Sequence, residues 1–216
     1  MKKELLIASC LVMAGSSAFA QSASFVPGFY AGVELGYARV EDQTQETASA
    51  LVGAFGGSVT VTQDLAIFDG RIFGGYKVTE NISLEVGYAQ SSSATTTASG
   101  RTGGSVAYTG SGEVSYSGFD FSVLLRPSMS TGFNNLFLRA GGTSLTQETS
   151  LSVSAGGTSA SATDSTSGMG YILGVGYDFP INKTLDVRVA YNYLGNIAGE
   201  SNNYANRFSI GLLGKF

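Results

Sequence analysis

The segment Leu185-Asp-Val-Arg-Val-Ala-Tyr-Asn-Tyr193 alternates in character at every step, and this alternation decides the fold class. Its odd-numbered positions are apolar or aromatic, whereas its even-numbered positions are charged or small. A period of two places successive side chains on opposite faces of an extended chain. The segment therefore predicts a β-strand with one apolar face and one polar face.

Seven other segments repeat this alternation, so the chain predicts eight strands in all. They cover residues 29–37, 68–78, 82–88, 119–126, 136–141, 170–179 and 207–216. Three apolar residues, Phe73, Leu124 and Phe137, fall outside the pattern of their segments. The longer segments hold about ten residues, which is the length of a strand that crosses a bilayer at a tilt.

The connections between these segments alternate between long and short. The long ones are residues 41–63, 90–111 and 147–166, with a moderate one at 195–203, and the short ones are residues 79–81, 127–134 and 180–184. Long loops at one end and short turns at the other are typical of outer-membrane barrels. We therefore predict an all-β protein that folds as an eight-stranded antiparallel up-and-down transmembrane β-barrel.

Aromatic residues near the strand ends favour this barrel over a soluble β-sandwich, whose strands would also alternate. One group lies toward the long loops: Tyr37, Tyr88, Tyr191 and Tyr193. A second group lies toward the turns: Phe29, Tyr76, Phe179 and Phe216. Two aromatic belts are expected where a barrel meets the two membrane interfaces. A helical membrane protein is excluded, because no stretch after the N-terminal segment approaches ~18 apolar residues.

The composition excludes several classes of function. The chain has 216 residues, 13% of them charged, with 30 glycines, three prolines and no histidine. Without histidine, the usual His-based acid–base and metal chemistry is excluded. A net charge of −4 argues against a nucleic-acid-binding protein, whose surface would be basic. We expect no catalytic residue, no metal and no cofactor.

The N-terminal twenty residues predict a cleaved signal peptide. Lys2 and Lys3 precede a short apolar run, and Ala18-Phe-Ala20 matches a cleavage site that would leave Gln21 as the new N-terminus. The domains expected are therefore a signal peptide over residues 1–20 and a barrel over residues 21–216. A lipoprotein signal ending at Cys10 is the weaker alternative, because the apolar stretch before Cys10 is too short.

The polar faces of the predicted strands carry charges of both signs. These residues are Glu34, Asp69, Arg71, Lys77, Glu85, Asp120, Arg126, Arg139, Asp178, Asp186, Arg188, Arg207 and Lys215. An eight-stranded barrel is only wide enough for side chains to fill it. We predict an ion-pair network that plugs the lumen, and we favour this plug over a conducting path. Inward glycines would make room for the long charged side chains.

Two C-terminal segments resemble a known family. The run Gly174-Val-Gly-Tyr-Asp-Phe-Pro-Ile-Asn-Lys-Thr-Leu-Asp-Val-Arg-Val-Ala-Tyr-Asn-Tyr193 resembles the last hairpin of small bacterial outer-membrane barrels of the OmpA/OmpX type. The terminal run Phe208-Ser-Ile-Gly-Leu-Leu-Gly-Lys-Phe216 is similar to the signal that the barrel assembly machinery reads in such proteins, with Phe208, Ile210, Leu212 and Phe216 as its apolar residues. The resemblance implies the outer membrane of a Gram-negative bacterium, with both termini in the periplasm.

The resemblance also implies partners during and after assembly. These are the barrel assembly machinery, periplasmic chaperones, outer-membrane lipids and lipopolysaccharide. Enzymes among small barrels depend on His with Ser or Asp, so no catalytic residue can be carried over. We therefore expect a non-enzymatic structural or surface-interaction role, adhesin-like, through four extracellular loops. The alternative is a small passive porin-like channel for small solutes.

The long connections carry whatever specificity a surface ligand would require. Residues 91–99 and 158–167 are small, polar and of low complexity, so we expect them to be mobile. Residues 59–62 and 106–116 keep a weak alternation, which suggests strands that continue beyond the membrane. Such extended edges could pair with a strand of another protein. Two interpretations stay open for these connections: they bind a host or cell-surface ligand, or they are filler that only shields the barrel.

Overall fold

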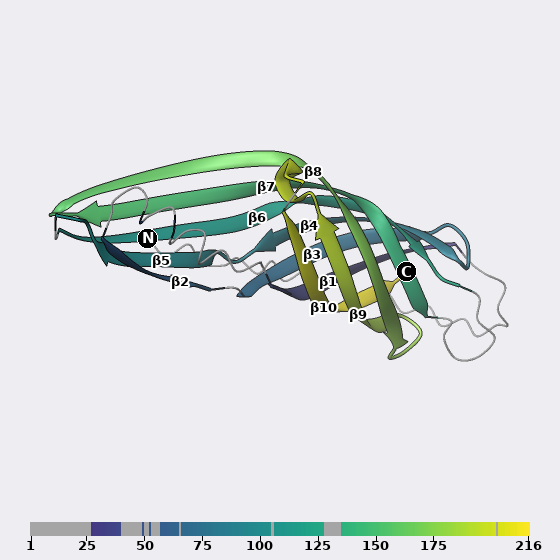
Figure 1. The fold of residues 1–216 in the computed structure, drawn as a ribbon. Helices are drawn as coiled ribbons and strands as arrows, with labels where there is room; N and C mark the ends of the chain where they lie inside the picture. The colour runs from purple at the N-terminus through teal and green to yellow at the C-terminus, as the bar shows by residue number, and fades with distance from the viewer. Residues whose placement is uncertain are drawn as a thin grey trace.

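The computed structural model describes residues 27–39, 49, 52, 57–64, 66–104, 106–127, 135–201 and 203–216 (Figure 1). The predicted signal peptide, with Ala18, Ala20 and Gln21 at its cleavage site and with Cys10, lies outside these described residues. Most of the connection between residues 41 and 56 lies outside them too.

Ten strands make up the described part of the chain. They are β1 (Gly28–Arg39), β2 (Ser58–Gln63), β3 (Ala66–Lys77), β4 (Ile82–Ser91), β5 (Ala94–Arg101), β6 (Ala107–Leu125), β7 (Leu136–Ala155), β8 (Thr158–Pro180), β9 (Leu185–Gly195) and β10 (Tyr204–Lys215), with a short 3-10 helix, η1 (Ile197–Gly199), before β10. No described helix is long and apolar enough to cross a membrane.

Eight of these strands close into a ring. Their order is β1-β3-β4-β6-β7-β8-β9-β10, and β10 pairs with β1 to complete it. Every neighbouring pair is antiparallel. The predicted fold class, a closed eight-stranded antiparallel barrel, is confirmed. Closure leaves each ring strand with a partner on both sides, which satisfies the backbone hydrogen bonds where no water is present.

The alternation in the sequence separates the two faces of the ring. In β1, Leu35 is 71% exposed on the outside, whereas the neighbouring Glu34 is 1% exposed on the inside. The same contrast separates Phe121, which is 55% exposed, from Asp120, which is 7% exposed. The aromatic belts lie on the outer face, where Phe29 packs against Tyr76 with ring centroids 4.7 Å apart. The ring is therefore apolar outside and ionic inside.

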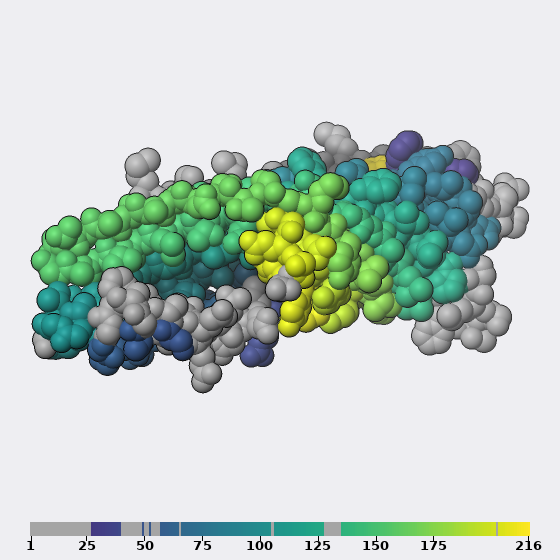
Figure 2. All heavy atoms as spheres, turned by 45° about the horizontal axis from the view of Figure 1, so that its top comes forward, coloured from purple at the N-terminus to yellow at the C-terminus, as the bar shows by residue number. Residues whose placement is uncertain are grey.

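Three ring strands are too long for the ring alone. β6, β7 and β8 hold 19, 20 and 23 residues, and they run well past β9 and β10 (Figures 1 and 2). Beyond the ring they continue as one sheet with β5 and β2, in the order β2-β5-β6-β7-β8. We call this sheet the extension; it consists of β2, β5 and residues 107–116, 146–155 and 158–167.

The extension corrects our expectation for the second and third long connections. Residues 90–111 and 147–166 are mostly strand, and the mobile loops expected at residues 91–99 and 158–167 are the strand β5 and the first part of β8. Hydroxyl side chains link neighbouring strands there, as in the pairs Ser150–Thr163 at 3.3 Å and Ser154–Ser159 at 3.2 Å. A hydrogen-bonded ladder thus orders these residues although they bury little apolar surface.

Short polar turns lie at the opposite end of the ring. In the turn between β8 and β9, the Asn182 side-chain oxygen accepts the backbone N–H groups of Thr184 and Leu185, each at 2.8 Å. In the turn between β3 and β4, the hydroxyl of Thr79 accepts the N–H of Ile82 at 3.0 Å. Such side-chain caps are typical of tight turns. The ring therefore has a turn end and an extension end.

Candidate functional site: the lumen and the extension

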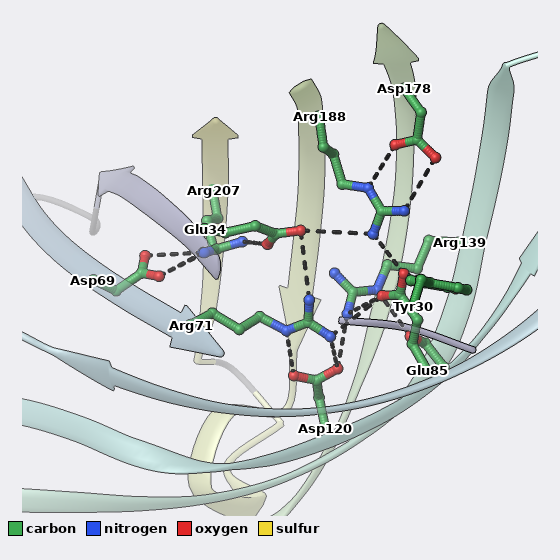
Figure 3. Close-up of polar contacts among 11 residues, drawn as sticks. Tyr30, Glu34, Asp69, Arg71, Glu85, Asp120, Arg139, Asp178, Arg188 and Arg207 are labelled. Carbon is green, nitrogen blue, oxygen red and sulfur yellow. Dashed lines mark hydrogen bonds and ion pairs between the residues drawn. The ribbon is translucent and has the colours of Figure 1, made fainter. Parts of the chain in front are cut away.

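A single network of ion pairs crosses the lumen (Figure 3). It joins five carboxylates and five guanidinium groups: Asp69, Arg207, Glu34, Arg71, Asp120, Arg139, Glu85, Arg188, Asp178 and Arg126. None of these side chains is more than 10% exposed. Equal numbers of both signs leave the network neutral, which is the condition for keeping charges buried.

Glu85 lies at the centre of the network. Its carboxylate oxygens lie 2.5 Å from Arg188 and 3.7 Å from Arg139. The Tyr30 hydroxyl donates to Glu85 at 3.0 Å, and Arg71 lies 3.4 Å away. These partners come from strands β1, β3, β7 and β9, so one carboxylate of β4 connects opposite walls of the barrel.

Bidentate contacts extend the network in both directions. Arg71 reaches Asp120 through Nε at 2.7 Å and through Nη2 at 2.8 Å. Arg188 makes a similar pair of bonds to Asp178, at 2.7 and 3.1 Å. Two parallel N–H···O bonds fix a guanidinium group in orientation as well as in position.

The other three predicted lumen residues lie near the turn end. Lys215 donates to Asp186 at 2.7 Å, apart from the large network. Lys77 is half-buried at the end of β3, and none of the ion pairs found in the described part of the chain includes it. Twelve of the thirteen predicted residues thus form ion pairs. Across the described ranges, no group of three or more His, Cys, Asp or Glu side chains could hold a metal ion.

Apolar side chains also lie at inward positions, among the charged residues of the same strands. Phe73, Leu124 and Phe137 are buried, at 5%, 0% and 1% exposed. Arg188 lies between the two rings, with its guanidinium carbon 5.0 Å from the centroid of Phe73 and 4.7 Å from that of Phe137. Cation–π contacts of this kind stabilise a desolvated guanidinium group. Two of the three residues that depart from the pattern, Phe73 and Phe137, therefore pack directly against the ionic network.

Inward glycines give these side chains their space. A Cβ atom at Gly87 would overlap the guanidinium group of Arg71, and one at Gly176 would overlap the ring of Phe137. At Gly36 it would meet the Asp69 and Arg207 side chains. The predicted spacing role of the inward glycines agrees with these contacts.

The connection between β9 and β10 covers the extension end of the lumen. Ile197 and Ala198 of η1 are 5% and 4% exposed and pack with Leu145 and Ala205. Ala198 has a φ of 54°, in the left-handed region that few non-glycine residues adopt. This apolar cap could not be read from the sequence, since it depends on a turn that folds inward.

The extension has two unlike faces. The face that continues the lumen wall carries residues such as Val61, Leu151 and Val153. The opposite face is mostly Ser and Thr, with the charged residues Arg101, Glu113 and Glu148 among them. Hydroxyls of neighbouring strands contact one another there, as in Ser111–Ser152 at 2.8 Å. A shallow hollow of about 310 Å³ lies over β6, β7 and β8 and is lined mainly by hydroxyl residues.

The residues predicted as an assembly signal lie on the last strand. Phe208, Ile210 and Leu212 are 55%, 54% and 50% exposed on the outer face of β10. Phe216 follows this strand, and its backbone N–H donates to the carbonyl of Phe29 at 3.0 Å. The terminal residue thus lies beside the first residues of β1, where the ring closes.

A closed ring with an apolar outer wall and an ionic interior defines an integral outer-membrane β-barrel. The chain belongs to the family of the OmpA-like transmembrane domain, whose family model matches residues 26–214. The chain is thus an outer-membrane barrel of a Gram-negative bacterium. No curated protein matches the chain.

Several solved structures are similar to the chain over most of its length. Ail, the attachment invasion locus protein of Yersinia pestis, is 13% identical, with 87% of this chain and 98% of that chain covered and a TM-score of 0.43. Neisserial surface protein A is 17% identical, with 87% and 97% covered and a TM-score of 0.37. OprG from Pseudomonas aeruginosa is 9% identical, with 88% and 95% covered and a TM-score of 0.41.

Proposed function

We propose that this protein is a non-enzymatic surface-interaction barrel whose lumen does not conduct. The observation that carries the proposal is the combination of a filled lumen with a sheet that continues beyond the membrane wall. A passive channel would require an open path along the axis. A surface-interaction protein requires an ordered structure that reaches beyond the membrane.

The filling of the lumen supports the first half of this proposal. The neutral network of ten charged residues spans the interior, and the apolar side chains of Phe73, Leu124 and Phe137 pack beside it. The cap formed by Ile197 and Ala198 adds a further barrier at the extension end. A conducting path would have to break several buried ion pairs, and an unpaired buried charge is costly.

The extension supports the second half of the proposal, the role in surface interaction. β6, β7 and β8 exceed the roughly ten residues needed to cross a bilayer, so their remaining residues lie outside the hydrocarbon. Its Ser- and Thr-rich face is suited to water and to polar ligands. We place the extension on the cell exterior. The C-terminal Phe216 lies at the turn end beside Phe29, so this end would lie in the periplasm, and we propose the same side for the N-terminus. A host or cell-surface ligand would then meet the extension rather than four separate loops.

Two measurements test the proposal. Purified protein in planar bilayers is expected to give no steady single-channel openings. A Ser152→Cys variant is expected to react with a membrane-impermeant thiol reagent on intact cells, whereas a Thr184→Cys variant, at the turn end, should react only after the outer membrane is opened. Regular openings would instead favour the channel, and the reverse labelling pattern would contradict the orientation.

We propose further that the barrel assembly machinery and periplasmic chaperones handle the chain before insertion. The apolar outer positions of β10, followed by Phe216, support this route. In the membrane, lipid chains and lipopolysaccharide would surround the apolar wall.

A further inference from the structure

The free edge of β8 is the least protected feature of the extension. In the described part of the chain, residues 158–167 pair with β7 on one side, whereas the pairing of β8 with β9 begins only at Tyr171. All ten of these residues are exposed. Alternate backbone N–H and C=O groups of an edge strand point away from its partner and can accept a further strand.

This edge lacks the features by which proteins usually block strand addition. Residues 158–167 contain no Lys, no Arg and no Pro, and Asp164 is their single charge. Their register with β7 runs without a bulge from the pair Ala155–Thr158 to the pair Thr146–Ser167. Charged side chains, prolines and bulges are the common protections of exposed edges.

We propose that this edge pairs with the same edge of a second copy of the chain, and that the second copy lies in a facing membrane. The proposal deepens the surface-interaction role proposed above and rests on it. The contact would be antiparallel and symmetric, so it would close after two copies.

The side chains of the edge are complementary to themselves. When Ala162 lies opposite Ala162 of the other copy, Ser161 lies opposite Thr163 and Ser159 opposite Ser165, with matching faces. These pairs repeat the hydroxyl pairs that already join β7 and β8. The two Asp164 side chains would be four positions apart along the strands, about 13 Å, so like charges would not oppose each other.

The direction of the strands decides whether the second copy lies in the same membrane or in an opposed one. Two copies in one membrane both run from the tip of the extension toward the same bilayer, so their β8 edges are parallel. The symmetric register described above requires the two β8 edges to run antiparallel. Only two copies in opposed membranes have β8 edges that run in opposite directions. One such contact is small, and many copies on each surface would supply the strength through avidity.

Cross-linking between two vesicle populations tests the pairing directly. Each population carries the full mature chain with a different tag and an Ala162→Cys substitution. We expect oxidation to give covalent dimers that contain both tags. The matched control is Leu151→Cys, because Leu151 lies opposite Ala162 on the neighbouring strand β7 and on the same face. The proposal is overturned if Ala162→Cys gives no mixed-tag dimers. It is also overturned if Leu151→Cys gives them as often as Ala162→Cys does.

Blocking variants on cells separate this proposal from the broader function. Thr163→Lys should reduce the clumping of expressing cells at least tenfold, whereas Ser150→Lys, at the paired position of β7, should leave it unchanged. Heat-modifiable migration on gels would verify that each variant is folded. Expressing cells that bind non-expressing cells equally well would overturn the homophilic pairing but keep the surface-interaction role. Steady channel openings would instead overturn that role.

Discussion

At the scale of single residues, the lumen is organised around charges that no solvent screens. Glu85 connects Arg188, Arg139 and Arg71 across the barrel, and its carboxylate has no exposed surface. Removing one partner of a buried ion pair leaves the others uncompensated. The strength of the network is therefore best measured by neutralising its central acid.

Glu85→Gln should lower the free energy of unfolding by about 3–5 kcal/mol, because it leaves an excess guanidinium charge in the lumen. Urea titration in lipid vesicles would measure this change. Glu148→Gln is the matched control, since Glu148 is exposed on the extension, and it should change the stability by less than about 0.5 kcal/mol. Equal effects of the two variants would contradict a stabilising network.

The outer wall allows a second test at this scale. Leu173 is 50% exposed on the lipid-facing side of β8. Leu173→Arg should cost roughly 2–4 kcal/mol, because the charge would lie in hydrocarbon. Ser161→Arg, on the same strand and the same face but within the extension, should cost close to nothing. Unfolding titrations of both variants in vesicles would show whether β8 passes from lipid to water between these two positions.

At the scale of elements, β10 closes the ring and carries the proposed assembly signal. It pairs with β1 on one side and with β9 on the other, and Phe216 joins β1 through its backbone N–H. The Phe216 side chain is 68% exposed and so adds little to the packing of the barrel. A role in recognition can therefore be separated from a role in stability.

Phe216→Ala should reduce the inserted fraction in cells several-fold but leave refolding of the purified chain into detergent unchanged. Phe179→Ala is the control, because Phe179 is also an exposed aromatic residue near the turn end. Immunoblots of outer-membrane fractions would measure insertion. Normal membrane levels of Phe216→Ala would argue against the assembly signal, and failure to refold would assign the residue a structural role.

At the scale of the whole molecule, the ring and the extension depend on different interactions. The ring is stabilised by closure, lipid contact and the ionic lumen, whereas the extension depends on backbone ladders and hydroxyl pairs. Thr146 and Ser167 mark the boundary, and their hydroxyls lie 2.8 Å apart. The part of the extension formed by β7 and β8 should therefore be removable without loss of the ring.

Replacing residues 147–166 with a two-residue Asn-Gly turn should leave insertion and the folded ring intact, since Thr146 and Ser167 are already paired. The same variant should lose surface interaction altogether. Heat-modifiable migration would report on the ring, and a cell-clumping assay would report on the interaction. Loss of the folded ring would show that the extension contributes to assembly of the barrel.

The sequence by itself determined the barrel, because a period of two with apolar and ionic faces fits only a closed ring once lipid surrounds it. It also identified the charged residues such as Glu85 and Arg188 that face inward. Tertiary structure alone decided that residues 91–99 and 158–167 lie in an ordered sheet, since hydroxyl-rich strands are stabilised by neighbours distant in the sequence. It likewise decided that Ile197 packs inside the extension end of the ring, because its position depends on a turn that folds inward, whereas Phe73 and Phe137 share the parity of the inward residues Arg71 and Arg139.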